Sequence, residues 1–233
     1  MAPELGPPVD FAGARAPGRE TLTGTHVRLE PLDPADHAAA LWDAAASGDP
    51  HLWDYLPYGP FDDRAAFDAW LVALHAGMPA DQRFFAIVRV ADDVPAGMLA
   101  YARIAPELGR IEIAHVWFGA ALQRTPDATE AVFLLAAHAF EALGNRRLEW
   151  KCNALNARSR RAAERFGFAY EGTFRQDMVV KGRNRDTAWF SLLDREWPRA
   201  GAAFRDWLAA DNFAEDGTQR RTLEDLRGGA AGG

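Results

Sequence analysis

The feature that most restricts the fold of this chain is a change in its hydrophobic pattern near residue 120. Before that point, residues 84–91, 95–104 and 110–118 are apolar segments separated by short turns, which predicts a meander of antiparallel strands. After it, residues 127–143 carry apolar side chains at helical spacing on nearly every side, which predicts a buried helix that Gly144 ends. A meander followed by a buried helix is typical of a mixed fold.

The next strand, expected at 146–152, completes a β-α-β unit with the strand at 110–118 and the buried helix. We therefore expect an α+β fold, with a mixed, mostly antiparallel, twisted sheet of six or seven strands flanked by helices. Asp33 and Asp62 are the expected N-caps of the first two helices. The other expected elements are strands at 25–32, 168–180 and 186–193 and helices at 34–47, 63–75, 156–166 and 197–210.

The two ends of the chain differ in composition from its centre. Residues 1–21 are rich in Pro, Gly and Ala and show no period, which predicts a flexible N-terminal arm. Residues 213–233 end in the run GGAAGG and are expected to form a flexible C-terminal tail. No internal repeat lies between them, so we expect a single domain over 22–212.

Charge and cysteine content restrict the function. The net charge of −7 argues against a protein that binds nucleic acid, which needs a basic face. The chain has no apolar run of membrane-spanning length and no signal peptide at its start, so we expect a cytoplasmic protein without a membrane partner. The lone Cys152 forms no intrachain disulfide and no cysteine-based zinc site, and we expect no metal.

The segment from Ala120 to Ala131 connects the meander to the buried helix. Gln123, Arg124 and Thr125 place donor side chains just before a helix N-terminus, whose free N–H groups and positive dipole end suit a phosphate. The alternative is that Asp127 is an ordinary N-cap and the segment binds nothing.

A second segment, Asn156 to Phe168, begins another helix. Asn156 and Ser159 lie on one face near its start, where they could meet the amide groups of a ligand. The alternative is a capping Asn with a Ser that faces solvent.

Together the two segments resemble the GNAT superfamily of N-acetyltransferases. Its pyrophosphate loop, Gln/Arg-x-x-Gly-x-Gly/Ala, is similar to Gln123, Pro126 and Ala128, with Pro in place of the middle Gly. The Ser at 159 and the start LEPL make the chain look like the Rim-type branch, which includes ribosomal-protein N-terminal acetyltransferases. The resemblance covers about Leu22 to Trp197. The later motif, Asn-x-x-Ala-x-x-x-Tyr-x-x-x-Gly-Phe, maps onto Asn156, Ser159, Ala163, Gly167 and Phe168.

The resemblance implies acetyl-CoA as the acyl donor and a primary amine of a small molecule or a peptide N-terminus as the acceptor. The family's usual tyrosine proton donor is replaced by Ala163, so Ser159 would contact the thiol in its place. A GNAT-fold protein that binds acyl-CoA as a sensor or scaffold, without turnover, is the alternative. The expected coenzyme-binding residues are Leu122, Gln123, Arg124, Thr125, Ala128, Thr129, Asn156 and Ser159.

Transfer to an amine requires a base, because an alkylammonium with a pKa near ~10 must lose a proton before it attacks. Glu112 lies eleven residues before Gln123, where members of the superfamily commonly place a Glu base. The alternative for Glu112 is a cross-strand salt bridge, for example with Arg103. His115 is the second candidate base, although alternation predicts that it faces away from Glu112.

The aromatic residues of 51–61 and Trp70 are expected to wall the acceptor pocket, although core packing is nearly as good an interpretation. Cys152 is interpreted as a core residue. Eight Trp residues in one domain suggest apolar surface that a second copy covers, which predicts a homodimer. The expected acceptor-site residues are Trp53, Tyr55, Tyr58, Trp70 and Trp117.

Overall fold

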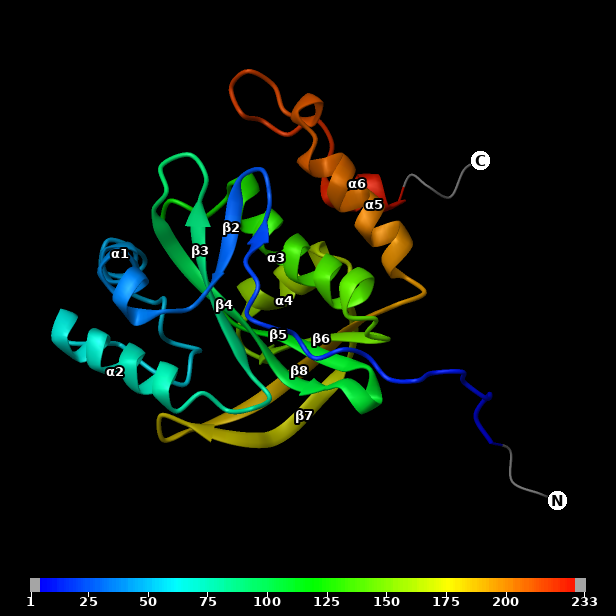
Figure 1. Ribbon diagram of the computed structural model, residues 1–233, viewed down its shortest axis with the longest axis horizontal. Helices are drawn as coiled ribbons and strands as arrows, with labels where there is room; N and C mark the ends of the chain where they lie inside the picture. Colours follow the sequence, from blue (N-terminus) through cyan, green and yellow to red (C-terminus); the bar gives the residue numbers. More distant parts are fainter. Residues whose placement is uncertain (1–4, 229–233) are drawn as a thin grey trace.

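The computed structural model describes residues 5–228, which form one eight-stranded sheet with helices on both faces (Figure 1). The strand order is β1-β2-β3-β4-β5-β6-β8-β7, in which β5 and β6 are parallel and the other neighbours antiparallel. The strands are β1 (Leu22–Thr23), β2 (Val27–Pro31), β3 (Arg83–Arg89), β4 (Pro95–Ala105), β5 (Arg110–Phe118), β6 (Arg147–Asn153), β7 (Ala169–Val180) and β8 (Arg183–Leu193).

The mixed, mostly antiparallel sheet confirms the expected fold class, with one strand more than the six or seven predicted. The additional strand, β1, has only two residues, which is too short to show a period in the sequence. The helices are α1 (Pro34–Ala46), α2 (Arg64–Ala76), α3 (Pro126–Ala137), continued by a π-helical turn (His138–Ala142), α4 (Ala157–Arg165), α5 (Trp197–Leu208) and α6 (Leu223–Gly228).

The sheet separates two apolar cores. On one face, Ile111 and Ile113 of β5 pack in one cluster with Leu135 of α3, as the apolar pattern of that helix predicts. On the other face, Ala100 of β4 lies in a cluster with Phe67 of α2. Helices α1 and α2 belong to this second cluster, whose strand residues come from β3, β4 and β5. The same face of β6, β8 and β7 carries polar side chains.

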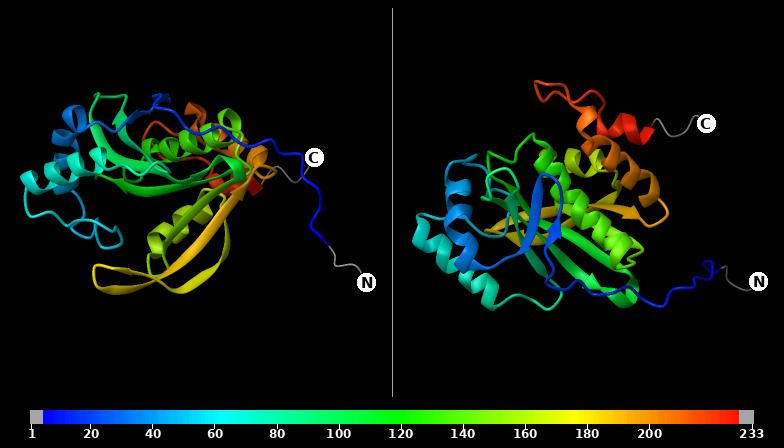
Figure 2. Two further views of the ribbon diagram at one scale, coloured as in Figure 1. Left: turned by 60° about the horizontal axis from the view of Figure 1, so that its bottom comes forward. Right: turned by 45° about the horizontal axis from the view of Figure 1, so that its top comes forward.

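The β7–β8 hairpin reaches beneath the sheet toward the segment that joins α1 and α2, as the left view of Figure 2 shows. At its tip, the Nζ of Lys181 donates a hydrogen bond to the backbone oxygen of Trp53 (2.7 Å). The hydroxyl of Tyr55 donates to the backbone oxygen of Leu155, before α4 (3.3 Å). The segment between α1 and α2 therefore contacts the β7–β8 hairpin through Trp53 and the residues before α4 through Tyr55. The part of this sheet face that α1 and α2 do not cover is the open face.

Two helix starts differ from those expected. Thr125, not Asp127, is the N-cap of α3, because Pro126 has the fixed φ that suits the first helical position. Asp63, not Asp62, caps α2, and its carboxylate accepts from the backbone N–H of Ala66.

The chain ends have contacts that their composition does not reveal. Residues 213–228, expected to be part of a flexible tail, carry α6, which packs on α5 through the buried Leu223. Within the arm at 5–21, Glu20 contacts His138 (2.9 Å). Residues 1–4 and 229–233 lie outside the described residues. In the described chain, every helix is too short or too polar to cross a bilayer.

Candidate functional site

The strands β5 and β6 separate at their carboxyl ends. Their parallel ladder runs from the pair Arg110 and Arg147 to the pair Ile113 and Trp150, and beyond it no further pairing joins the described parts of these strands. Helices α3 and α4 both begin at this edge, since each follows directly on one of the two strands. In open sheets, ligands bind at the carboxyl ends of parallel strands, which makes this edge the candidate site.

The N-terminus of α3 presents groups that suit a phosphate. The hydroxyl of Thr125 donates to the backbone oxygen of Leu122 (2.8 Å) and does not cap the helix. Pro126 has no N–H, so the first-turn N–H groups that no side chain of the N-cap covers begin at Asp127. Arg124 is exposed, has a left-handed backbone (φ 62°) and makes no side-chain hydrogen bond or ion pair with residues 5–228. A free guanidinium beside a positive helix end fits an anionic group.

Other residues expected in the coenzyme site have partners within the protein. Gln123 donates to the backbone oxygen of Phe118 (2.9 Å). Leu122 and Thr129 are buried, and Thr129 accepts from Arg165 (3.1 Å), whereas Ala128 is half-buried on the first turn of α3. Of the polar side chains expected to bind the coenzyme in this loop, Arg124 is therefore the one without a partner among residues 5–228.

The start of α4 confirms the capping interpretation of Asn156 and leaves room for the other. Its side-chain oxygen accepts from the backbone N–H of Ser159 (3.0 Å), so its amide N–H groups stay available. The hydroxyl oxygen of Ser159 accepts from the indole of Trp150 (3.0 Å), so its own proton can be donated elsewhere. Cys152 is buried in the core, and burial raises the pKa of its thiol.

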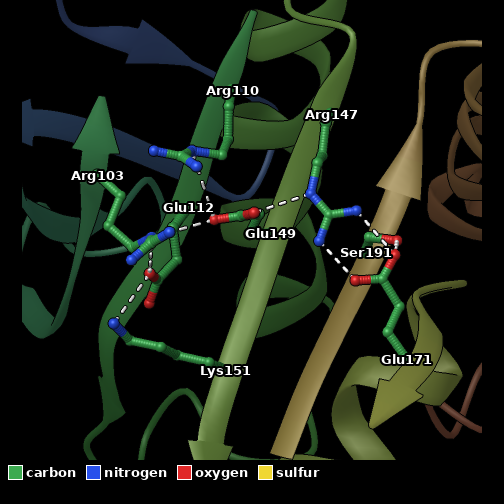
Figure 3. Close-up of polar contacts among 8 residues, drawn as sticks. All are labelled: Arg103, Arg110, Glu112, Arg147, Glu149, Lys151, Glu171 and Ser191. Carbon is green, nitrogen blue, oxygen red and sulfur yellow. Dashed lines mark hydrogen bonds and ion pairs between the residues drawn. The ribbon is translucent and has the colours of Figure 1, made fainter. Parts of the chain in front are cut away.

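Glu112 lies on the open face of the sheet and is almost fully buried, with 1% of its surface exposed (Figure 3). One carboxylate oxygen is 3.3 Å from the Nζ of Lys151 and 3.7 Å from the Nε of Arg103. Burial raises the pKa of Glu112 to about 7, although Lys151 and Arg103 oppose the shift. The expected contact with Arg103 is therefore present, yet the carboxyl can still gain or lose a proton near neutral pH.

His115 lies on the same face as Glu112, so the prediction that it faces the other way was wrong. The ladder between β4 and β5 changes register here, and His115 has a left-handed backbone (φ 54°), which redirects its side chain. Its ring is 4.8 Å from that of Phe84 and 5.8 Å from that of Tyr58. Burial lowers the pKa of His115 to about 4, so the ring is neutral at pH 7.

Four of the five aromatic residues expected to wall the acceptor pocket, Trp53, Tyr58, Trp70 and Trp117, form one cluster beside His115. Tyr55 lies outside this cluster and is exposed. The ring of Tyr58 is 4.4 Å from that of Trp70, and the ring of Trp53 is 5.7 Å from that of Trp117. Trp53 and Trp117 are buried, so the packing interpretation holds for them. The hydroxyl of Tyr58 and the indole N–H of Trp117 are buried without a partner among the described residues, so this cluster holds two polar groups whose hydrogen bonding is incomplete.

A row of polar side chains continues from Glu112 across the sheet (Figure 3). Glu149 accepts from Arg147 (2.8 Å) and from Arg103 (3.2 Å). Glu171 accepts from both terminal nitrogens of Arg147 (2.8 and 2.5 Å) and from Ser191 (2.7 Å). Hydrogen bonds from Arg147 and Ser191 lower the pKa of Glu171 to about 2.

Sequence reasoning missed Lys151, the contact of Glu112 made across the parallel pair. The sequence feature that could have identified it is the alternation of Arg147, Glu149 and Lys151 along β6, which places all three side chains on one face.

Among the described residues, His, Cys, Asp and Glu form no group suited to a metal ion.

The comparison with known families gives one extended match. The sequence profile described as "acetyltransferase (GNAT) domain" matches residues 26–169, more than half of the chain. The uncharacterized N-acetyltransferase p20 of Bacillus licheniformis is 30% identical over 173 residues, which cover 73% of this chain and 93% of p20.

Further relatives cover different shares of the chain. YdaF of Bacillus subtilis, provisionally named a ribosomal N-acetyltransferase, is 32% identical over 101 residues, 43% of this chain and 55% of YdaF, so that match spans about half of the relative. The crystal structure of a GCN5-related N-acetyltransferase from Brucella melitensis superposes with a TM-score of 0.89 at 44% identity and covers 94% of this chain and 99% of that one. A GNAT-family structure from Chromobacterium violaceum has a TM-score of 0.76 at 46% identity, covering 85% and 98%.

Proposed function

Because the chain belongs to the GNAT family of N-acetyltransferases, we propose that it moves an acetyl group from acetyl-CoA to a primary amine, by direct attack within a ternary complex. The family membership confirms the resemblance found in the sequence. The observation that carries the proposal is the position of Glu112, a buried carboxyl with a pKa of about 7, on the strand that leads to the edge where β5 and β6 separate.

The residues at this edge fit acetyl-CoA. Arg124 and the uncovered N–H groups of α3 would hold the pyrophosphate. The gap beyond Ile113 and Trp150 would hold the pantetheine arm, whose amides Asn156 would contact. When bound, acetyl-CoA supplies the acetyl thioester that the amine attacks.

In this proposal Glu112 accepts the proton of the incoming ammonium, directly or through a water molecule. A base with a pKa near the working pH is suited to this, because it is ionised in part of the population and still holds a proton well. The hydroxyl of Ser159 donates a hydrogen bond toward the departing sulfur. His115 stays the second candidate base, and its low pKa makes it a weak proton acceptor at pH 7.

The acceptor is a small-molecule amine or a peptide N-terminus. The provisional name of YdaF supports a peptide, whereas the aromatic cluster of Tyr58 and Trp70 supports any acceptor with an apolar part. Release of thiol from acetyl-CoA in the presence of a panel of amines and N-terminal peptides tests the proposal. Thiol release above the rate of hydrolysis with at least one acceptor is expected, and tight coenzyme binding without any release would favour the sensor or scaffold alternative.

Coenzyme binding is tested separately by calorimetry. Arg124→Ala is expected to weaken the binding of coenzyme A by about 1 kcal/mol or more, because a charge-assisted contact to phosphate is lost. Asn156→Ala is expected to weaken it too. Arg220→Ala, which removes an exposed arginine near the C-terminus, is the matched control. Wild-type affinity in both Arg124→Ala and Asn156→Ala would contradict this placement.

The cytoplasmic location and the homodimer stay predictions. The original reason for the dimer is weakened, since Trp53, Trp197 and Trp207 are buried within one chain. The edge strand β7 gives a better reason, because it is twelve residues long and exposes Phe174 and Val179 along a free edge. Light scattering at micromolar concentration is expected to give the mass of two chains, and a monomer would exclude the dimer.

A further inference from the structure

Strand β8 carries three polar side chains whose hydrogen-bonding groups are buried and without a partner in the described chain. They are the Nε of Arg185, the hydroxyl of Thr187 and the indole N–H of Trp189. Thr187 is fully buried and Arg185 is 9% exposed. Such groups lose hydration when the chain folds, and each costs free energy unless a ligand or water completes its bonding.

The three side chains point to one face of the sheet, because they occupy alternate positions of a strand. The register of β6 and β8 shows which face this is, since Trp189 is paired with Lys151 and Thr187 with Asn153. Lys151 contacts Glu112, so the row on β8 faces the same side as the proposed base.

The charges on this face do not suit a simple cationic acceptor. The guanidinium of Arg103 and the ammonium of Lys151 lie over the ring of Trp189, at 4.9 and 5.3 Å from its centre. Both lie near Glu112, the buried carboxylate on the same face of the sheet. Arg185 adds a third positive charge and forms no ion pair with any residue from 5 to 228. A buried guanidinium without a counter-charge is costly, which points to an anion that arrives with the substrate.

Arg185 is also close to the candidate reaction centre. Burial is the main cause of the lowered pKa of His115, and the positive charges of Lys151 and Arg185 lower it further. Arg185 lies two residues beyond Thr187, the last residue of β8 that pairs with β6, so it is past the carboxyl end of β6, at the edge where β5 and β6 separate. The two charged groups that act on the pKa of His115, Lys151 and Arg185, are both positive.

We propose that Arg185, Thr187 and Trp189 form a carboxylate-binding subsite that selects acceptors with a carboxylate close to the amine. This deepens the proposed function and rests on it. One guanidinium matches the single charge of a carboxylate, which can accept two parallel hydrogen bonds from it. The carboxylate belongs either to an amino acid, next to its amine, or to an acidic side chain near a peptide N-terminus.

Matched acceptors separate these sources. L-phenylalanine is compared with L-phenylalaninamide, and the peptide Ala-Asp-Phe-amide with Ala-Asn-Phe-amide. Within one pair, the ratio of kcat/KM values for the acid and the neutral acceptor is measured in the wild type and in Arg185→Gln. Differences in intrinsic amine reactivity cancel when the two proteins are compared. Arg183→Gln, which removes an exposed arginine from the same strand, is the control.

The wild type is expected to prefer the acid in one pair by about 10- to 100-fold, the range of a charge-assisted hydrogen bond. Arg185→Gln is expected to lose most of this preference, because kcat/KM for the acid falls more than kcat/KM for the neutral acceptor. Thr187→Val is expected to reduce it in part, and Arg183→Gln to retain it. Which pair shows the preference identifies the source of the carboxylate.

Calorimetry of the same acceptors with protein saturated with coenzyme A tests the subsite without turnover. Tighter binding of the acid that Arg185→Gln abolishes supports the subsite, even if no thiol release occurs, and in that case the proposed function alone is refuted. Equal binding and equal kcat/KM for acid and neutral members of both pairs would overturn the inference and leave the acetyltransferase proposal standing. A preference that survives in Arg185→Gln would also overturn it.

Discussion

The two ends of the polar row on the open face carry the same kind of residue in opposite states. At the β5 end, Glu112 is buried and its pKa is raised to about 7. At the β7 end, Glu171 is well exposed, receives two hydrogen bonds from Arg147 and has its pKa lowered to about 2. The difference comes from burial and from the quality of the pairing, since cations are close to both carboxylates.

This contrast indicates which end can perform proton transfer. A carboxylate held by two parallel hydrogen bonds, with a pKa of about 2, stays ionised near neutral pH, so Glu171 only orders its neighbours. One carboxylate oxygen of Glu112 is 3.3 Å from the Nζ of Lys151 and 3.7 Å from the Nε of Arg103. The same oxygen has no well-formed hydrogen bond in the described structure. A group in that state can accept a proton near neutral pH.

The largest expected effect is the loss of activity in Glu112→Gln. Gln keeps the shape and removes the base, so kcat/KM should fall by about 10²-fold or more, and the lower limb of the pH profile should flatten. His115→Gln serves as the comparison and should retain activity within about 5-fold, since a ring with a pKa near 4 is a weak base. A Glu112→Gln enzyme with the wild-type rate and pH profile on its true acceptor would refute the role.

The next effect concerns stability. The pKa of Glu112 in the folded chain, about 7, is above its ordinary value of 4.5, so the folded state binds more protons between these values and the free energy of unfolding decreases as pH rises through that window. The decrease is at most about 3 kcal/mol. Glu112→Gln removes this term, so its Tm should fall less than that of the wild type between pH 5 and pH 8 in calorimetric scans. Parallel Tm curves would show that Glu112 does not titrate there.

A smaller change is expected from Lys151→Met, which keeps much of the side-chain bulk and removes the charge. Lys151 opposes the raised pKa of Glu112, so its loss should raise that pKa further. The lower limb of the kcat/KM profile should move to higher pH, with the plateau changed less. Arg110→Met, which removes a cation that contacts Glu149 and not Glu112, is the control. An unmoved limb in Lys151→Met would argue that another group sets the profile.

The smallest effect is expected at the other end of the row. Glu171→Gln should leave kcat/KM within about 2-fold and reduce stability at pH 7 by about 1 kcal/mol or less, because the pair is partly exposed to solvent. The pKa of Glu171 is lowered, so its contribution is complete above pH 4.5 and is lost as pH falls toward 2. Urea unfolding at pH 7 and pH 3 measures this, and a large loss of activity would contradict the division between the two ends.

The long elements were predictable from the sequence, since the apolar pattern of 127–143 and the segments of the meander repeat over many residues. The two-residue β1 and the packing of α6 were not, because neither is long enough to show a period. Glu112 was identified by its offset from Gln123, a family pattern. The side on which His115 lies was missed, because a left-handed backbone at a residue other than glycine has no signature in the sequence. The partners of Glu112, and the lack of a partner for Arg185, depend on pairings between distant strands and required the structure.

The separation of β5 and β6 has a mechanical consequence. The ladder between them has four residue pairs, so the sheet has a seam: five strands lie on one side and three on the other (Figure 1). A molecule bound in the gap beyond these pairs would contact both parts of the sheet, in place of the backbone hydrogen bonds that β5 and β6 do not form there. The two halves should therefore unfold together more cooperatively when the gap is filled, and the seam should be the first part of the sheet to exchange its amide protons when it is empty.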